Sequence, residues 1–122
     1  MKSSDRDPIL FLEDILQSIS RVEEYVHGLD FKSFKQDYKT VDAVVRNFEI
    51  IGEASKNMPG DIKVRYPKIP WDQMYRLRNR ISHEYFGIDY EIIWDILKNY
   101  LPENKADIQK ALDSEKAKSK GS

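Results

Sequence analysis

The spacing of apolar residues along the chain predicts a series of amphipathic helices. For the first helix, Asp7 supplies the cap, Pro8 the first turn and Gly28 the stop. The apolar residues between them recur three and four positions apart: Ile9, Leu12, Ile15, Leu16, Ile19, Val22 and Val26. A single apolar stripe of this kind is typical of a helix that packs one side on a core.

A second long helix is expected to begin at Thr40, a good capping residue, and to end before Pro59. Its apolar residues fall on two sides. One side carries Val41, Val44, Val45, Phe48, Ile51 and Gly52, and the other carries Ala43, Asn47, Ile50 and Ala54. A helix with two apolar sides is buried on both, either inside the fold or at a dimer interface.

The remaining segments complete a helical pattern. Asp30 is expected to cap a short helix or turn that places Phe31 and Phe34 under the core, and one helical turn is expected within residues 61–69. Asp89 is expected to cap the last core helix. The apolar residues of that helix are Ile92, Ile93, Ile96, Leu97 and Tyr100, followed beyond a kink or restart at Pro102 by Ile108 and Leu112.

Together these elements predict an all-α fold, an antiparallel bundle of four to five helices. The bundle is expected to occupy residues 1–113, and the lysine- and serine-rich residues 114–122 are expected to form a polar tail. No apolar run approaches the roughly 18 residues that a membrane helix needs, and the N-terminus lacks the apolar core of a signal peptide. We therefore expect a cytoplasmic protein with no membrane partner.

The stretch from Trp71 to Gly87 contains the side chains that are most capable of taking part in catalysis or ligand binding. A helix is expected from about Pro70 to about Phe86, closed by Gly87 in the left-handed conformation. On a helical wheel, one stripe carries Arg76, Asn79, Arg80 and His83, and the apolar side carries Met74, Leu77, Ile81 and Tyr85.

Arg78 points toward that apolar side, which is an unusual place for a guanidinium group. Burying the group without a partner would cost several kcal/mol, so it requires a carboxylate, a second chain or a ligand. Glu49 and Glu53 on the preceding long helix are candidate counter-charges.

Composition narrows the possible chemistry. The chain of 122 residues has no cysteine and only two histidines, far apart in sequence, so neither a metal site nor a cofactor is expected. Because the net charge is −1, nucleic-acid binding would need a local basic patch. Residues 61–80 provide one, with Lys63, Arg65, Lys68, Arg76, Arg78 and Arg80 against Asp61 and Asp72, interleaved with Tyr66, Trp71 and Tyr75. Basic groups alternating with aromatic rings suit a single-stranded nucleic acid.

These residue types are sufficient for cleaving RNA, whose 2′-hydroxyl is a built-in nucleophile. A base must take the proton of that hydroxyl, an acid must protonate the leaving 5′-oxygen, and cations must stabilise the charged phosphorane. Imidazole, with a reference pKa near 6.5, can take or give the proton, and arginine stays charged throughout. From the residues alone, an ion-paired helical surface is the commoner alternative.

The residues Arg78-Asn-Arg-Ile-Ser-His83-Glu-Tyr85 resemble the R-x4-H-x-Y signature of the HepT-like toxins of the HEPN superfamily. The resemblance extends to residues 11–16, 45–55 and 83–90, and so covers nearly the whole chain. The pattern R-x4-H alone is permissive, whereas the combination of these segments in this order is more specific.

The resemblance implies a HEPN-like bundle that forms a two-fold dimer, with the motif helices meeting in a cleft. It implies a metal-independent endoribonuclease, the toxin of a toxin–antitoxin pair, that cuts an RNA substrate. In that enzyme Arg78 and His83 are the catalytic pair, and Asn79 is the polar residue after the arginine. It further implies an MntA-like nucleotidyltransferase antitoxin that neutralises the toxin by AMPylation of Tyr85.

Helical geometry leaves the catalytic cation open. On one helix Arg78 and His83 would lie about 140° apart. Either a second protomer supplies one of them, or the long side chain of Arg78 extends around the helix toward His83. Arg76, on the stripe of His83, is the alternative catalytic cation, and Arg80 is a candidate RNA contact.

Other functions would use the same fold. A non-catalytic helical module that docks a nucleotidyltransferase is the main alternative. A DNA-binding function is disfavoured, because the chain lacks both a positive net charge and a short helix-turn-helix spacing. Whether the antitoxin would act by AMPylation or by occluding the site is also left open.

Overall fold

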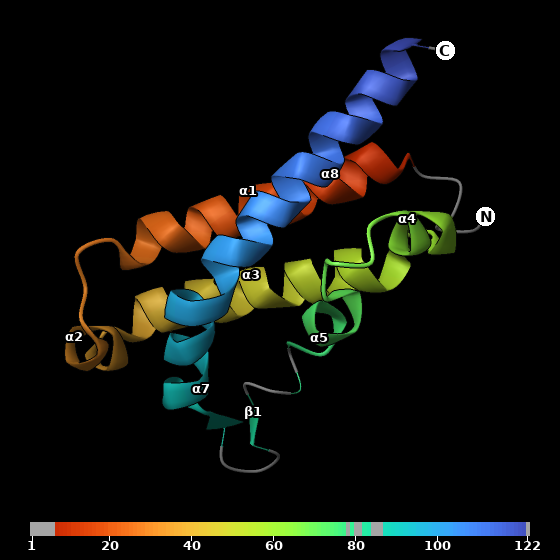
Figure 1. The fold of residues 1–122 in the computed structure, drawn as a ribbon. Coiled ribbons are helices and arrows are strands. Elements are labelled where there is room, and N and C mark those ends of the chain that lie inside the picture. Colours follow the sequence, from red (N-terminus) through yellow and green to blue (C-terminus); the bar gives the residue numbers. More distant parts are fainter. Residues whose placement is uncertain (1–6, 78, 80–81, 84–86, 122) are drawn as a thin grey trace.

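Helices α1 and α3 form an antiparallel pair on which the rest of the chain packs (Figure 1). Helix α1 spans Pro8–Val26, α3 spans Tyr38–Asn57, and the short helix α2, Phe31–Gln36, connects them at one end. The computed structural model describes residues 7–77, 79, 82–83 and 87–121. Within these residues the all-α fold class is confirmed, apart from one pair of two-residue strands.

The first two helices begin as the sequence predicts. The Asp7 carboxylate accepts a hydrogen bond from the Ile9 N–H at 2.9 Å, and the Asp30 carboxylate accepts one from the Ser33 N–H at 2.8 Å. Helix α1 ends before Gly28, whose φ of 81° lies in the left-handed region that favours glycine. The buried apolar side chains of α1 are Phe11, Leu12, Ile15, Ile19, Val22 and Val26.

Helix α3 begins earlier than predicted, and the expected cap at Thr40 is wrong. Asp37 is the cap, because its Oδ1 accepts a hydrogen bond from the Thr40 N–H at 3.2 Å and its Oδ2 accepts one from the Thr40 hydroxyl at 2.7 Å. The hydroxyl and then the N–H of Thr40 hold the pKa of the Asp37 carboxyl below its usual value. A carboxylate three residues upstream thus satisfies both donors of the residue that resembled a cap.

Both predicted apolar sides of α3 are covered. Val44, Phe48 and Ile51 from one side and Asn47 and Ala54 from the other are at most 5% exposed. The remaining members of the two stripes are buried or half-buried. Helices α1 and α5 are the main elements that pack on α3, so burial within the described chain needs no second protomer.

Gly52 allows α5, Trp71–Tyr75, to approach α3 closely. A Cβ atom at Gly52 would lie 3.1 Å from the Tyr75 carbonyl oxygen and 3.5 Å from that of Met74. Because 3.1 Å is shorter than an ordinary van der Waals contact, a larger residue here would require α5 to move. The position of α5, and of the residues that follow it, therefore depends on this glycine.

We expect Gly52→Val to destabilise the protein by about 1–3 kcal/mol, the usual range for overpacking a well-filled site. Thermal unfolding followed by circular dichroism would measure the change. Gly60→Val is the matched control, because a Cβ at Gly60 meets no atom within 4 Å. Equal melting temperatures for the two variants would contradict the close approach of α5.

The C-terminal part of the chain forms one continuous helical run. It comprises α7 (Tyr90–Asp95), the π-helical turn η2 (Ile96–Tyr100) and α8 (Leu101–Gly121). The predicted cap Asp89 is confirmed by a 3.0 Å hydrogen bond from the Ile92 N–H. The π-helical turn ends two residues before Pro102, which lacks an N–H and so cannot donate an α-helical hydrogen bond to the carbonyl of Lys98 in that turn.

One predicted core residue of this run is wrong. Tyr100 is 45% exposed, whereas Ile108 and Leu112 are buried as predicted. A π-helical turn holds more residues than an α-helical turn, so it shifts the residues that follow out of the 3.6-residue register. The apolar pattern alone assumes that register throughout.

Helix α8 packs on α1 and runs in the opposite direction. Lys105 Nζ lies 2.7 Å from Glu23 Oε1, and Lys116 Nζ lies 3.5 Å from Glu13 Oε2, so the pairs advance along α8 while they move back along α1. Exposed pairs of this kind contribute only about 0–1 kcal/mol each. The buried apolar residues of α8, such as Leu112, are therefore the main source of its attachment.

Residues 114–121, expected as a polar tail, are helical and continue α8. Glu115, whose side chain is 12% exposed, accepts hydrogen bonds from Arg65 Nη1 at 2.8 Å and from the Tyr66 hydroxyl at 2.5 Å. Burial alone would raise the pKa of the Glu115 carboxyl, but these two hydrogen bonds, together with the positive charges of Arg65 and Lys118, lower it below its usual value. The contact ties α8 to α4, Gly60–Arg65, the helical turn expected in this region.

The long helix predicted from Pro70 through Phe86 is wrong. Helix α5 ends after five residues, and Arg76 occupies its C-cap with φ −89° and ψ 5°. Leu77 and Asn79 are helical again, but the chain then leaves the helical conformation. Residues 84–86 lie outside the described part of the chain.

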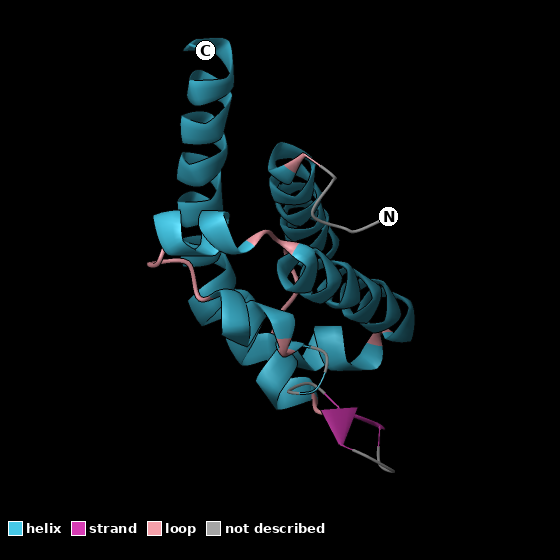
Figure 2. Ribbon diagram, turned by 90° about the vertical axis from the view of Figure 1, so that its right-hand side faces the viewer, coloured by secondary structure: helices cyan, strands magenta, loops and turns pink. Residues whose placement is uncertain are grey.

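A short hairpin follows. Strand β1, Ser82–His83, pairs antiparallel with β2, Gly87–Ile88, and His83 lies opposite Gly87. The left-handed conformation predicted for Gly87 is confirmed by its φ of 85°, but it belongs to a hairpin and not to a helix end. The hairpin and the C-terminus of α8 lie at opposite ends of the molecule (Figure 2).

Two classes of feature are absent from the part of the chain that the structure describes. No helix there is both long enough and apolar enough to cross a membrane. No three histidine, aspartate or glutamate side chains there gather in a way that could hold a metal ion.

Candidate functional site

The predicted site residues divide into those that the structure describes and those that it does not. The residues outside the described part are Arg78, Arg80 and Tyr85. The backbone of His83 is described in β1, and Arg76 and Asn79 are described with their side chains. The roles assigned to Arg78, Arg80 and Tyr85 therefore stay predictions.

The hairpin changes the geometric relation between Arg78 and His83. The separation of about 140° applied to two residues on one ideal helix. His83 is a strand residue, so that objection to the pair no longer applies. For the same reason, Arg76 no longer gains support from sharing a helical stripe with His83.

Arg76 nevertheless remains an available cation. Its side chain is 63% exposed, and its Nε lies 3.4 Å from Asp72 Oδ2, one helical turn earlier. An ion pair between two exposed side chains contributes about 0–1 kcal/mol. The guanidinium group can therefore exchange this carboxylate for a phosphate group, which it binds in a similar fork geometry.

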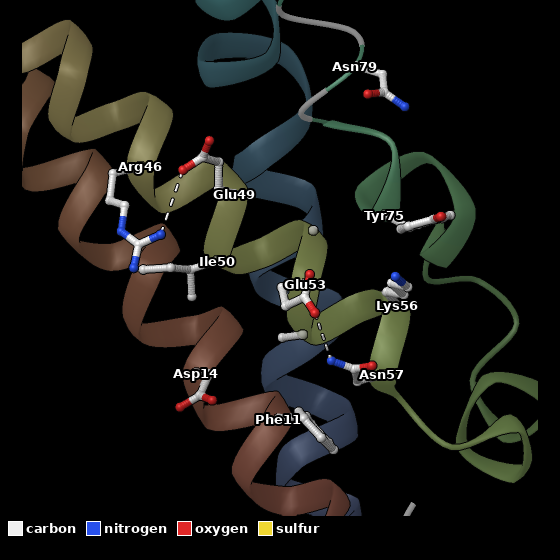
Figure 3. Close-up of a pocket in the computed structure, with 12 residues that line it drawn as sticks. Phe11, Asp14, Arg46, Glu49, Ile50, Glu53, Lys56, Asn57, Tyr75 and Asn79 are labelled. Carbon is white, nitrogen blue, oxygen red and sulfur yellow. Dashed lines mark hydrogen bonds and ion pairs between the residues drawn. The ribbon is translucent and has the colours of Figure 1, made fainter. Parts of the chain in front are cut away.

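Asn79 lines a groove of about 570 Å³ between α1, α3 and the segment that contains α5 (Figure 3). We call this the α3 groove. Its lining residues are Phe11 and Asp14 from α1, Arg46, Glu49, Ile50, Gly52, Glu53, Ala54, Lys56 and Asn57 from α3, and Tyr75 and Asn79 from the far side. The structure thus places Asn79 in the lining of a groove that also contains an exposed tyrosine and a polar helix face.

Most polar side chains on the α3 face of the groove interact with one another. Arg46 Nη1 lies 3.6 Å from Glu49 Oε1, and Asn57 Nδ2 donates a hydrogen bond to Glu53 Oε2 at 3.2 Å (Figure 3). Lys56 is exposed, and no ion pair joins it to another residue of the described ranges. Its ammonium group is therefore available to an anionic ligand.

The sequence-based prediction assigns no role to Arg46 or Lys56, although a signal for the groove exists. Arg46, Glu49, Glu53 and Lys56 recur at intervals of three or four residues, so they share one side of α3. A polar stripe on a helix that is otherwise buried indicates that this side of the helix faces solvent. The two apolar stripes of α3 obscure that pattern.

The family of the chain is established by comparison with known proteins. The family model described as "Ribonuclease HepT-like" matches residues 15–111, a range that includes Arg78, His83 and Tyr85. The chain belongs to the HepT-like ribonuclease family, which confirms the predicted family resemblance.

Named relatives agree with this assignment. The chain is 44% identical over 110 residues to "Probable ribonuclease HepT" of Thermococcus cleftensis, which covers 90% of this chain and 97% of that protein. It is 43% identical over 107 residues to "Putative RNase MJ0127" of Methanocaldococcus jannaschii, which covers 88% of each chain. No solved structure matches the chain.

Proposed function

We propose that this protein is a metal-independent endoribonuclease, the toxin of a toxin–antitoxin pair, that cuts RNA at a site built around Arg78 and His83. The observation that carries the proposal is the family match over residues 15–111, which contains the complete R-x4-H-x-Y motif ending at Tyr85. The exposed Arg76 and the groove beside Asn79 support it, because they supply a cation and space next to the motif.

In the proposed reaction the RNA supplies its own nucleophile. The 2′-oxygen forms a bond to phosphorus as the bond from phosphorus to the 5′-oxygen breaks, which leaves a 2′,3′-cyclic phosphate and a 5′-hydroxyl. The proton of the 2′-hydroxyl is removed and the 5′-oxygen gains one, and the His83 imidazole carries out one of these transfers. Arg78 stabilises the extra negative charge on the phosphorane, with Arg76 as the alternative cation and Arg80 as an RNA contact.

A two-fold dimer is part of the proposal. Arg78 of one protomer and His83 of the other would then share one scissile phosphate, so the site would be incomplete in a monomer. A symmetric dimer repeats the arrangement and provides two such sites. The strand location of His83 is compatible with this arrangement, because a hairpin extends beyond the helices that form the core (Figure 2).

The test is cleavage of single-stranded RNA by the purified protein in the presence of a chelator. We expect cuts with 2′,3′-cyclic phosphate ends, and no cut at a nucleotide whose 2′-hydroxyl is replaced by hydrogen. Absence of cleavage together with tight binding to a nucleotidyltransferase would instead support the non-catalytic docking module.

The proposed antitoxin is an MntA-like nucleotidyltransferase that transfers AMP from ATP to Tyr85: the tyrosine oxygen forms a bond to the α-phosphorus, the bond to the β-phosphate breaks, and pyrophosphate and the hydroxyl proton leave. We expect Tyr85→Phe to remain an active ribonuclease that the antitoxin and ATP no longer silence, because the acceptor oxygen is missing. Intact-protein mass spectrometry would show an AMP adduct on the wild type alone. Silencing of Tyr85→Phe without ATP would indicate occlusion in place of modification.

A further inference from the structure

We propose that the Tyr75 ring is a stacking platform for one base of the RNA, and that the strand continues over Tyr75 from the α3 groove into a second groove beside α5. Lys56 and Lys63 hold phosphates on the two sides of this platform. The inference rests on the proposed ribonuclease function and adds the residues that bind RNA away from the scissile phosphate.

The structure leaves one of the three aromatic residues in the basic segment free for stacking. The Trp71 side chain is part of the core, since the residue is 7% exposed, and its indole N–H donates a hydrogen bond to the Tyr66 carbonyl oxygen at 3.0 Å. The Tyr66 hydroxyl donates to Glu115 at 2.5 Å, and the ring is half-buried. Tyr75 is 43% exposed, so its ring alone of the three offers an open surface to a base.

Tyr75 belongs to two grooves at once. It lines the α3 groove together with Asn79, and it also lines a second groove of about 570 Å³. The other residues that line the second groove are Lys63, Ile69, Pro70, Trp71, Asp72 and Gln73. A strand that leaves the motif beside Asn79 therefore meets the Tyr75 ring on its way into the second groove.

Each groove has in its lining a lysine that no ion pair joins to another residue of the described chain, and its ammonium group can bind a phosphate. The carboxylate of Glu49 lies 3.6 Å from Arg46, and that of Asp72 lies 3.4 Å from Arg76. The α3 groove is also lined by Asp14 and by Glu53, whose Oε2 accepts a hydrogen bond from Asn57. Lys56 in the first groove is exposed, and Lys63 in the second is half-buried. One ammonium group thus lies in each groove, with Tyr75 in both linings.

The position of Tyr75 is also built into the fold. The backbone of α5 at Tyr75 lies against Gly52 of α3, at the distance that only a residue without Cβ permits comfortably. A base stacked on this ring is therefore held at a fixed place relative to the α3 groove. Aromatic rings stack on any base. This platform therefore contributes to the affinity for RNA and to the alignment of the strand with the α3 groove, more than to sequence preference.

The test is binding of a 2′-O-methyl RNA of about ten nucleotides, which lacks the nucleophile and cannot be cut. Fluorescence anisotropy would compare Tyr75→Ala and Tyr75→Leu with Tyr75→Phe. We expect the first two to weaken binding roughly 5- to 150-fold, the usual loss for one stacked base, and Tyr75→Phe to bind like the wild type. Tyr38→Ala is the matched control, because Tyr38 is a 69% exposed tyrosine that lines neither groove.

The lysines are tested by the salt dependence of the same binding. We expect Lys56→Gln and Lys63→Gln each to reduce the slope of log affinity against log salt by about 0.7, the value for one phosphate contact on a single strand. Lys110→Gln, on the exposed side of α8, should leave the slope unchanged. Unchanged slopes for the two groove variants would overturn the proposed path of the strand.

The outcomes separate this inference from the ribonuclease proposal. If Tyr75→Ala and Tyr75→Leu keep their melting temperatures and bind the oligonucleotide like the wild type, the platform is overturned even where the wild type cleaves RNA. If they lose binding only to a nucleotidyltransferase, the face is a protein interface and the platform is again overturned. If binding depends on Tyr75 but no RNA is cut, the platform stands and the ribonuclease proposal fails.

Discussion

Replacing His83 by alanine is expected to lower the rate of RNA cleavage by a factor of about 10²–10⁴, the contribution of one positioned acid–base group. Alanine can neither take the proton of the 2′-hydroxyl nor give one to the 5′-oxygen, whereas the cations that bind the phosphate are retained. The rate is measured under single-turnover conditions with chelator present, so that product release and adventitious metal do not enter.

The other histidine of the chain provides the control. His27 is the exposed C-cap residue of α1, outside the lining of either groove, so His27→Ala should cleave at the wild-type rate. Both variants should unfold near the wild-type temperature. A His83→Ala protein that is folded and cleaves normally would remove the imidazole from the mechanism, and with it the proposed reaction.

Local rules predict most of the fold because many helix ends are determined by neighbouring residues. Asp7, Asp30 and Asp89 each cap the helix that the sequence predicts, through hydrogen bonds that span two or three residues. The exception at α3 is also local. Asp37 and Thr40 are both good capping residues. Asp37 is the cap because its carboxylate accepts hydrogen bonds from both the N–H and the hydroxyl of Thr40.

Two larger errors arise where contacts outside a single helix decide the structure. The helix expected through Phe86 follows from a wheel that fits the residues well, but a hairpin pairs β1 with β2 instead. The polar residues near the C-terminus show no apolar period, yet Glu115 joins them to α4 through Arg65 and Tyr66. No local pattern indicates a contact between two residues that are separated by 49 or 50 positions in the sequence.

The same long-range contact limits how much of the site the sequence predicts. Residues 61–80 form a basic and aromatic segment in the sequence, but Arg65 and Tyr66 turn to Glu115 and Trp71 enters the core. The segment therefore offers fewer groups to RNA than its composition indicates. The α3 groove shows the opposite error, because Lys56 comes from a helix whose apolar stripes dominate its pattern.

Mixing two inactive variants tests whether the site is shared between protomers. Arg78→Ala and His83→Ala are each expected to be inactive alone, and an equal mixture that exchanges subunits should recover roughly a quarter of wild-type activity. Half of the dimers would then be mixed, and each mixed dimer would have one intact site out of two. Single-turnover cleavage after subunit exchange measures this recovery.

Two controls make the result decisive. Size-exclusion chromatography must show that Arg78→Ala is still a dimer, because loss of the dimer would identify Arg78 as an ion-pair strut between protomers instead of a catalytic group. A mixture of His83→Ala with the double variant Arg78→Ala/His83→Ala should recover nothing, since neither protomer has an imidazole at position 83. If the mixture of single variants also stays inactive although mixed dimers form, Arg78 and His83 act within one chain. The proposal of a shared site is then wrong, and the proposal of ribonuclease activity is unaffected.

If Arg78→Ala is dimeric and active alone, Arg76 becomes the catalytic cation, and the same exchange experiment with Arg76→Ala decides where it acts.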